Sequence, residues 1–471
     1  MTGSLGSSSR SPADAYSPQF RTALILTGTG TAGAYHAGVL RALHEAGIKI
    51  DLVGGHGIGV VGALFAAVDG DQHLWGERGF WRSAAVRGLY PWQPIVRVAV
   101  WAFALSVAVV IVPIATVALG LFVYPIDFVL KMVTVRGASD LVEWYLRFAQ
   151  AAFSPEALPT WLPRIVVLAL GSVATVALVT GWMNGGPRRQ RGPFWWRMVR
   201  PPLSSAEAAD RCWAVMWRLL RGASLKQPTS RELALRYIDL AAENLGQPGF
   251  RELVLVVHDV DAHHDLVFAL VAESGRRHLI RRPTTHASEA RRAEVFDLGG
   301  LAREYLADVV AGALTIPVAS EPTVLTFASD AFWRGETHRV CDRPAIVARV
   351  LEEMVELGAE QLIVVSAAAE RRAPHTLAPP RLDGRGRLGD YLQSSEAAAL
   401  RDCTRAAESR GLHLFTIQPG HNPIGPFDFA DGFDDRSDRR QGLDELMARG
   451  YEDAYRQFIE PVVGASGEVL D

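Results

Sequence analysis

Cysteine is scarce in this sequence, and neither sign of charge is in large excess. The three cysteines, Cys212, Cys341 and Cys403, lie far apart and form no Cys-x-x-Cys pair or Cys/His metal-binding spacing. This argues against a disulfide framework and predicts reduced thiols in a domain that faces a reducing compartment. The formal net charge of the 471 residues is only −3. The basic footprint of a nucleic-acid-binding protein is therefore missing, and we expect no nucleic acid among the partners.

The beginning of the chain also lacks the apolar stretch of a signal peptide. Residues 1–20 are mostly small and polar, so the sequence predicts a disordered tail there and a second short tail at 463–471.

Hydrophobic residues, by contrast, are abundant, at 49% of the chain, and the mean hydropathy is +0.11. Two internal runs, 98–126 and 165–187, contain no charged side chain. Each exceeds the roughly 20 apolar residues that a helix needs to cross about 30 Å of hydrocarbon. The alternative, a pair of buried core helices, is less consistent with runs of this length. We therefore predict a transmembrane helical hairpin over 95–187.

The flanks of the two runs predict their orientation. A basic and aromatic segment at 188–204 follows the second run, as expected at the cytoplasmic interface. It contains Arg188, Arg189, Arg191, Arg197 and Arg200 beside Phe194, Trp195 and Trp196. The connection 127–164 carries four basic and four acidic side chains, so it shows no positive excess. We expect a multi-pass protein with two spans, whose soluble parts both lie on the cytoplasmic face.

A glycine-rich turn follows the first apolar strand, 23–26, and precedes a helix. Backbone N–H groups at such a turn suit an anion or a developing oxyanion. The glycine spacing also matches a dinucleotide-binding fingerprint, but Asp51 precedes the next apolar strand instead of ending it. A tight turn without a ligand is a further alternative. The residues of this predicted oxyanion loop are Gly28, Thr29, Gly30, Thr31 and Gly33.

A second strand, 48–53, enters a sharp turn that leads into an apolar helix from Val60. A strand, a Gly-x-x-x-Gly turn and a buried helix are the parts of a nucleophile elbow. The elbow residues are Gly55, His56, Gly57, Ile58 and Gly59.

With these two blocks the chain resembles the patatin-like phospholipase family of lipid acyl hydrolases. The resemblance covers about 20–90 and 205–460 and implies an α/β fold, a central mostly parallel sheet flanked by helices. The domain would consist of two parts, 21–94 and 205–462, interrupted by the hairpin. It also implies membrane lipid or an acyl chain as partner, and no cofactor.

An active member of the family uses a serine–aspartate dyad, and this sequence departs from that pattern at both positions. The elbow position expected to be serine is Gly57, which has no side chain. After the Ile316-Pro317 turn, the step expected to hold the aspartate aligns with Arg334-Gly335, which places Arg334 at the acid position. We expect a structural role for His56.

A group of histidines and aspartates at 258–265 lies between two predicted strands. A polar hairpin loop is the simpler reading, so no metal site is predicted. Two hypotheses stay open: a membrane-anchored, catalytically inactive relative of these hydrolases, and an active lipid acyl hydrolase that uses an unrecognised nucleophile.

Overall fold

A computed structural model describes residues 16–133, 138–154, 162–183, 201–221, 226–280, 293–369, 383–434 and 436–463. The chain divides into two compact units. Unit 1 comprises 1–91 and 204–471, and unit 2 comprises 92–203. The basic and aromatic segment predicted at the membrane interface lies, up to residue 200, outside the described residues.

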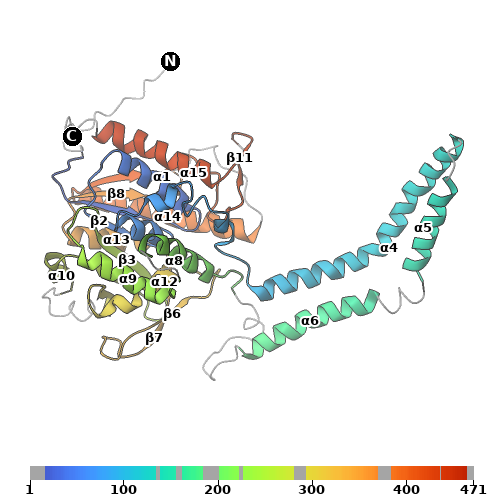
Figure 1. The fold of residues 1–471 in the computed structure, drawn as a ribbon, viewed down its shortest axis with the longest axis horizontal. Helices are drawn as coiled ribbons and strands as arrows, with labels where there is room; N and C mark the ends of the chain where they lie inside the picture. Colours follow the sequence, from blue (N-terminus) through green and yellow to red (C-terminus); the bar gives the residue numbers. More distant parts are fainter. Residues whose placement is uncertain are drawn as a thin grey trace, which may run out of the picture. The chain divides into compact units, whose positions relative to one another are not determined.

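Unit 1 is a mixed α/β domain around a nine-stranded sheet (Figure 1). The main path runs β5-β4-β3-β2-β1-β8-β9, and the β6–β7 hairpin pairs with β3 through β7. Pairing is parallel along β3-β2-β1-β8-β9 and between β4 and β5. The strands are β1 (Thr22–Leu26), β2 (Leu52–Gly55), β3 (Glu252–Asp259), β4 (His264–Leu270), β5 (Val295–Asp297), β6 (Thr323–Thr326), β7 (Thr337–Cys341), β8 (Gln361–Val365) and β9 (His413–Ile417).

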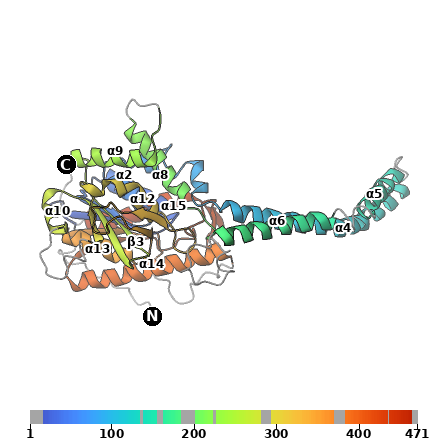
Figure 2. The same ribbon diagram turned by 90° about the horizontal axis from the view of Figure 1, so that it is seen from below.

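Helices cover both faces of this sheet, as Figure 2 shows for α14 on one side and α2, α8 and α9 on the other. The helices and helical turns of unit 1 are α1 (Ala32–Glu45), α2 (Gly59–Ala66), α3 (Gln72–Trp75), η2 (Ala84–Gly88), α8 (Ala206–Leu220), α9 (Ser230–Glu243), α10 (Glu273–Ile280), η4 (Leu301–Tyr305), α12 (Leu306–Ala313), α13 (Ile346–Glu356), α14 (Gly384–Ser409), α15 (Leu443–Ala454) and η5 (Tyr455–Val463). A small ribbon, β10 (Gly432–Asp434) and β11 (Arg439–Gln441), lies outside the sheet.

The core follows the two-residue period of the strands. Ala23 and Ile25 of β1 pack in one cluster with Val350 and Met354 of α13. Leu26 points the other way, toward Gly62 of α2. Because both faces of the parallel strands are covered, β1, β2 and β8 are buried along their whole length. The expected mostly parallel α/β sheet flanked by helices is confirmed.

The polar segment 258–265 forms the end of the β3–β4 hairpin, as expected. Its acidic side chains pair with nearby basic groups: Asp265 with His258 at 2.8 Å, Asp259 with His338 at 2.6 Å and Asp261 with Arg339 at 2.5 Å. All three cysteines are unpaired and buried.

Unit 2 is helical and apolar on its surface. It contains α4 (Pro94–Met132), α5 (Ala138–Ala152) and α6 (Leu162–Met183). In the described residues one stretch, Ile114–Met132, is long and apolar enough to cross a membrane, and two shorter apolar helices span Pro94–Val109 and Pro163–Val179. The two predicted runs fall in α4 and α6, and residues 184–187 lie outside the described residues. The structure thus contains one candidate span where the sequence predicted two.

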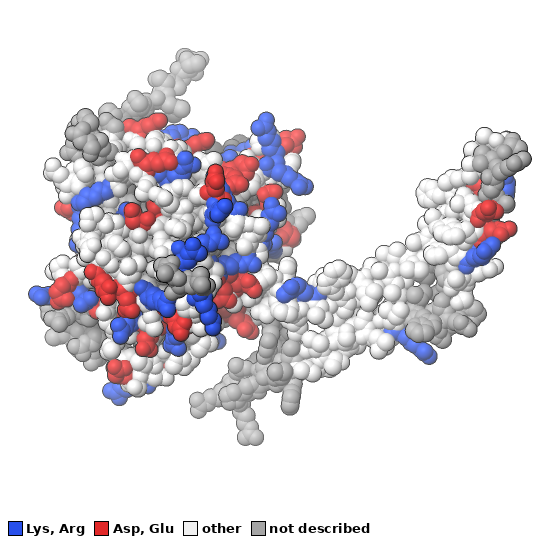
Figure 3. All heavy atoms as spheres, in the orientation of Figure 1, with Lys and Arg blue, Asp and Glu red and all other residues white. Residues whose placement is uncertain are grey.

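Large apolar side chains on α4 and α6 are widely exposed. Trp101, Leu121 and Leu168 are 75%, 73% and 72% exposed. Figure 3 shows few charged side chains along the middle of this unit. The helix α5, which lies between α4 and α6 in the sequence, packs against α4 through the buried Tyr145. The hydroxyl of Tyr145 donates to the Thr116 carbonyl at 3.1 Å.

Candidate functional site

The glycine-rich turn and the elbow meet at the carboxyl ends of β1 and β2. These strands are parallel neighbours, so the turns that follow them, 27–31 and 56–58, emerge at the same edge of the sheet. The amide of Ile58 donates to the Gly28 carbonyl at 2.9 Å, and the amide of His56 donates to Leu26 at 3.3 Å. The oxyanion loop and the elbow predicted from sequence are therefore in direct contact.

Gly57 stands at the apex of the elbow with φ +56°, in the left-handed region that favours glycine. A Cβ atom added here would lie 2.6 Å from Oδ2 of Asp342 and would collide with the carbonyl oxygen of Gly28. The backbone at this apex thus has the strained geometry of a nucleophile elbow but leaves no free volume for a side chain.

Asp342, and not Arg334, is the charged residue beside Gly57, which corrects the sequence prediction. Asp342 directly follows β7, and its amide donates to the Thr315 carbonyl at 3.0 Å. Arg334 lies in the β6–β7 turn, exposed and with φ +43°. The sequence prediction placed the acid position at Arg334 because a glycine, Gly335, follows it in that turn. Asp342 lies one strand later and is followed by Arg343 in place of glycine.

The carboxylate of Asp342 is held by the residue next to Gly57. Nδ1 of His56 lies 2.9 Å from Oδ1 of Asp342, and both side chains are buried. Burial disfavours the charged imidazole, but the Asp342 carboxylate outweighs it and raises the pKa of His56. His56 and Asp342 therefore form a buried contact, an ion pair when the imidazole is protonated, that links the elbow to the end of β7.

A second buried carboxyl, Glu396 of α14, lies on the other side of the glycine-rich turn. It accepts hydrogen bonds from the hydroxyls of Thr27 at 2.7 Å and Ser366 at 2.5 Å. Burial raises the pKa of Glu396, although both hydroxyls oppose the shift. Sequence reasoning missed Ser366 and Glu396. Ser366 could have been noticed because it directly follows the apolar strand β8, at the edge where the elbow lies.

The amide donors of the oxyanion loop are partly occupied. The Thr31 amide donates to the Pro426 carbonyl at 3.0 Å, and its hydroxyl donates to Gly425 at 2.9 Å. A Cβ at Gly30, where φ is +61°, would collide with the same Pro426 carbonyl. The segment before Phe427 therefore covers the turn that would otherwise face a substrate.

Little space remains at this edge. The cavity between the glycine-rich turn, Ala367, Leu392 and Glu396 has a volume of about 10 Å³, which is room for about one water molecule. Of the remaining predicted residues, Thr29 lies in the glycine-rich turn, Gly55 ends β2, and Gly33 and Gly59 lie at the starts of α1 and α2. Among the described residues, the elbow and the glycine-rich turn thus meet at a glycine apex, beside a cavity with room for about one water molecule.

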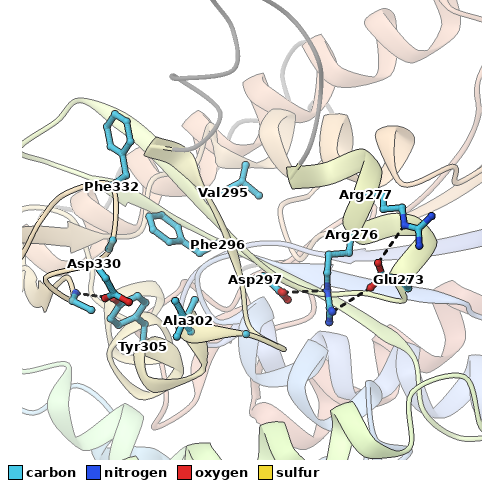
Figure 4. A pocket seen from close by; sticks show the side chains of 14 residues that line it. Glu273, Arg276, Arg277, Val295, Phe296, Asp297, Ala302, Tyr305, Asp330 and Phe332 are labelled. Carbon is cyan, nitrogen blue, oxygen red and sulfur yellow. Dashed lines mark hydrogen bonds and ion pairs between the residues drawn. The ribbon is translucent and has the colours of Figure 1, made fainter.

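A larger cavity of about 420 Å³ lies at the other edge of the sheet (Figure 4). Phe296 of β5, Tyr305 of η4 and Phe332 line it, and Arg276 at one end pairs with Asp297 at 3.1 Å and with Glu273 at 3.3 Å. It contains none of the elbow or oxyanion-loop residues.

The site thus consists of a glycine-rich turn and a strand–turn–helix elbow with glycine at its apex, on an α/β domain. No protein-family model matches the chain. Patatin-like phospholipase domain-containing protein 6 of Mus musculus is 58% identical over 45 residues, 9% of this chain and 3% of that protein. ZK370.4, a patatin-like phospholipase domain-containing protein of Caenorhabditis elegans, is 53% identical over 49 residues, 10% of this chain and 4% of that protein.

Lysophospholipase nte1 of Aspergillus fumigatus is 52% identical over 44 residues, again 9% of this chain and 3% of the relative. The chain thus spans only a few per cent of the length of these relatives. Among solved structures, VipD from Legionella pneumophila aligns over 94% of this chain and 66% of its own, with a TM-score of 0.28 and 11% identity, which is too distant to support an argument. The sequence matches relate the chain to the patatin-like phospholipase family over one segment of about 45 residues.

Proposed function

We propose that this protein is a membrane-anchored, catalytically inactive relative of the patatin-like lipid acyl hydrolases, which contacts lipid without hydrolysing it. The observation that carries the proposal is the elbow itself. Its nucleophile position is Gly57, and the carboxylate beside it, Asp342, is paired with His56. A serine–aspartate dyad needs a hydroxyl within hydrogen-bond reach of the base, and glycine supplies none.

The relatives are named as phospholipases and lysophospholipases, which supports a lipid as the ligand of this chain. In the proposal, lipid contacts the apolar surface of α4 and α6, because the cavity beside the glycine-rich turn is too small for an acyl chain. In this arrangement unit 2 forms the helical hairpin in the bilayer, with both spans returning the chain to the cytoplasmic face. The α/β domain then acts there as a sensing or scaffolding module.

We expect Gly57→Ser not to create an esterase. The new Cβ would need the Gly28 carbonyl and Asp342 to move, at a cost of about 1–3 kcal/mol. The cavity of about 10 Å³ beside the glycine-rich turn would still be too small for an ester. Hydrolysis of short-chain p-nitrophenyl esters and of phospholipid vesicles should stay at the level of the unmodified protein, while the melting temperature falls. Turnover by Gly57→Ser that disappears again in Gly57→Ser/Asp342→Asn would contradict the proposal.

The alternative, an active hydrolase with another nucleophile, has one specific observation in its favour: the short contact between Ser366 and Glu396. A serine beside a carboxyl at the same edge of the sheet has the components of such a pair. The two hypotheses separate in one assay of the unmodified protein. Hydrolysis that Ser366→Ala abolishes and Ser409→Ala leaves intact supports the alternative. Ser409 is a suitable control because it lies at the end of α14, where its hydroxyl bonds only within the helix.

Membrane anchoring predicts that a charge on the exposed face of α4 is costly. Val117 is 60% exposed, so in water an arginine there should be harmless. At the centre of a membrane helix it costs roughly 2.5–3.5 kcal/mol. We expect Val117→Arg to reduce the fraction of full-length protein that resists alkaline extraction from membranes. Tyr391→Arg, at a slightly more exposed position of α14 (69%), is the control and should have no effect.

Topology is tested on the same membranes. Protease added to sealed vesicles should reach residues before 95 and after 190 from the same side, since two crossings return the chain to the side it left. Opposite accessibility of the two flanks would rule out the hairpin, whatever the result of the extraction experiment.

A further inference from the structure

A group of potential metal ligands lies at the end of unit 1 opposite the elbow. His44 belongs to the last turn of α1, and Asp69 and Asp71 follow α2. One ligand atom from each side chain can be chosen so that all three lie within 4.8 Å of one another. Since α1 and α2 begin at the glycine-rich turn and the elbow, their far ends lie beside the amino ends of the strands. The group is therefore separate from the degenerate active site.

Asp71 is the member of this group that points to a ligand. The residue is only 4% exposed, and its Oδ1 atom is buried without a hydrogen-bond partner among the described residues. Its other oxygen lies 3.7 Å from Nδ1 of His44, longer than a hydrogen bond. An isolated buried carboxylate oxygen is costly, because water no longer solvates it. A bound cation would satisfy it.

The surrounding groups compensate this charge only in part. Arg251 is the nearby cation, but it is directed to Asp69, at 3.2 Å, and to the Ala66 carbonyl. Asp69 is held in the left-handed region at φ +54°. Backbone strain at a non-glycine residue persists only when the surroundings hold it in place.

We propose that His44, Asp69 and Asp71 bind a divalent transition-metal ion, for which Zn²⁺ is the best fit, and that this ion ties the end of α1 to the segment after α2. Imidazole nitrogen and carboxylate oxygen are both ligands of zinc in proteins, and water would complete the coordination beside these three side chains. Calcium and magnesium prefer oxygen ligands alone. The role is structural: the ion fixes the far ends of the two helices whose near ends form the oxyanion loop and the elbow.

To bind a zinc ion, the three ligand atoms must move slightly closer together. Ligands at 2.0–2.2 Å from a tetrahedral zinc ion lie about 3.4 Å apart, against the present limit of 4.8 Å. The side chains of His44 and Asp69 are 35% and 45% exposed, so rotation of their outer torsions can supply the difference without moving the core. Asp71, which is buried, remains the fixed ligand.

The test is zinc binding by the full-length protein after treatment with EDTA, by calorimetric titration and thermal unfolding. We expect one high-affinity Zn²⁺ per chain and a rise of the melting temperature by about 3 °C, with no such rise for Mg²⁺. His44→Gln and Asp71→Asn should each weaken this binding by at least about tenfold. Asp402→Asn, an exposed aspartate on α14, is the matched control and should bind like the unmodified protein.

The variants are needed because the chain has 13 histidines, which can bind zinc weakly elsewhere. Identical titrations for the unmodified protein and both ligand variants would overturn the proposal. So would a lack of any zinc-dependent stabilisation, which would leave the group as an ion-pair network around Arg251. If Asp71→Asn fails to fold, the exposed His44→Gln still gives the answer. Mg²⁺ stabilising the protein in place of Zn²⁺ would overturn the assignment of the ion.

Discussion

Asp342→Ala is expected to destabilise unit 1 by about 3 kcal/mol, since breaking a buried ion pair by removing one partner leaves the other charge uncompensated. The charge left behind is His56, whose side chain is fully buried and whose Nε2 atom has no partner among the described residues. Urea denaturation at pH 6 measures the loss. Asp402→Ala, at an exposed position, is the control and should change the free energy of unfolding by less than about 0.5 kcal/mol.

The pH dependence of this effect identifies its cause. The pKa of His56 is raised in the folded protein, mainly by Asp342 working against burial. A raised folded-state pKa stabilises the fold below the unfolded value, near pH 6.5, and this contribution disappears as the pH rises through the folded-state pKa. The cost of Asp342→Ala should therefore be larger at pH 6 than at pH 9. A cost that does not vary with pH, or a double variant with His56→Ala that is fully additive, would contradict the ion-pair assignment.

His36 is expected to make unit 1 sensitive to acid. Its side chain in α1 is fully buried, and burial, reinforced by the nearby His56, lowers its pKa to about 3. Below pH 6.5 the unfolded chain binds a proton that the folded chain rejects, so stability falls as the pH drops and the loss is complete near pH 3. At about 1.4 kcal/mol per pH unit, the full loss from this group approaches about 5 kcal/mol.

The measurement compares His36→Leu with the unmodified protein from pH 7 to pH 4. Carboxyl groups titrate in both proteins, so the difference in the free energy of unfolding isolates His36. The variant should gain on the unmodified protein steadily as the pH falls. His413→Leu is the control, because the ring of His413 is only partly buried and stacks on Phe20 at the start of the sheet. A constant difference for His36→Leu across this range would show that the pKa of His36 is the same in the folded and unfolded chains, and would contradict the prediction.

The elbow and the glycine-rich turn could be predicted from the sequence because each is local. A strand, a turn of small residues and a helix follow one another within about 15 residues, and the parallel pairing of two such strands brings their ends together. Gly57 and Gly28 are therefore neighbours for a reason visible in the residues alone. The central sheet was predictable on the same grounds.

Asp342, Ser366 and Glu396 could not be assigned in the same way. The strands and the helix that carry them lie far apart in the chain. Asp342 follows a hairpin whose length cannot be read from the sequence. Glu396 lies in the middle of a long helix, with no characteristic turn residues beside it. The sequence pattern favoured Arg334, which is followed by a glycine, over Asp342, which is followed by Arg343. His44, Asp69 and Asp71 escaped prediction as ligands because they lie about 25 residues apart and meet only when α1 packs beside α2.

The two ends of unit 2 run side by side, with Trp92 bridged to Leu203 and the amide of Gln93 donating to Pro202 at 2.8 Å. Pro91 and Ser204 are the residues of unit 1 that flank unit 2, and the amide of Ser204 donates to the carbonyl of Pro91 at 3.0 Å. The insertion roughly doubles the length of chain between β2 and β3, yet each doubling of a flexible loop adds only about 0.6 kcal/mol of closure entropy. In evolutionary terms, the insertion of these helices at this point costs the α/β domain little stability, because the chain leaves and re-enters the domain at adjacent residues, Pro91 and Ser204.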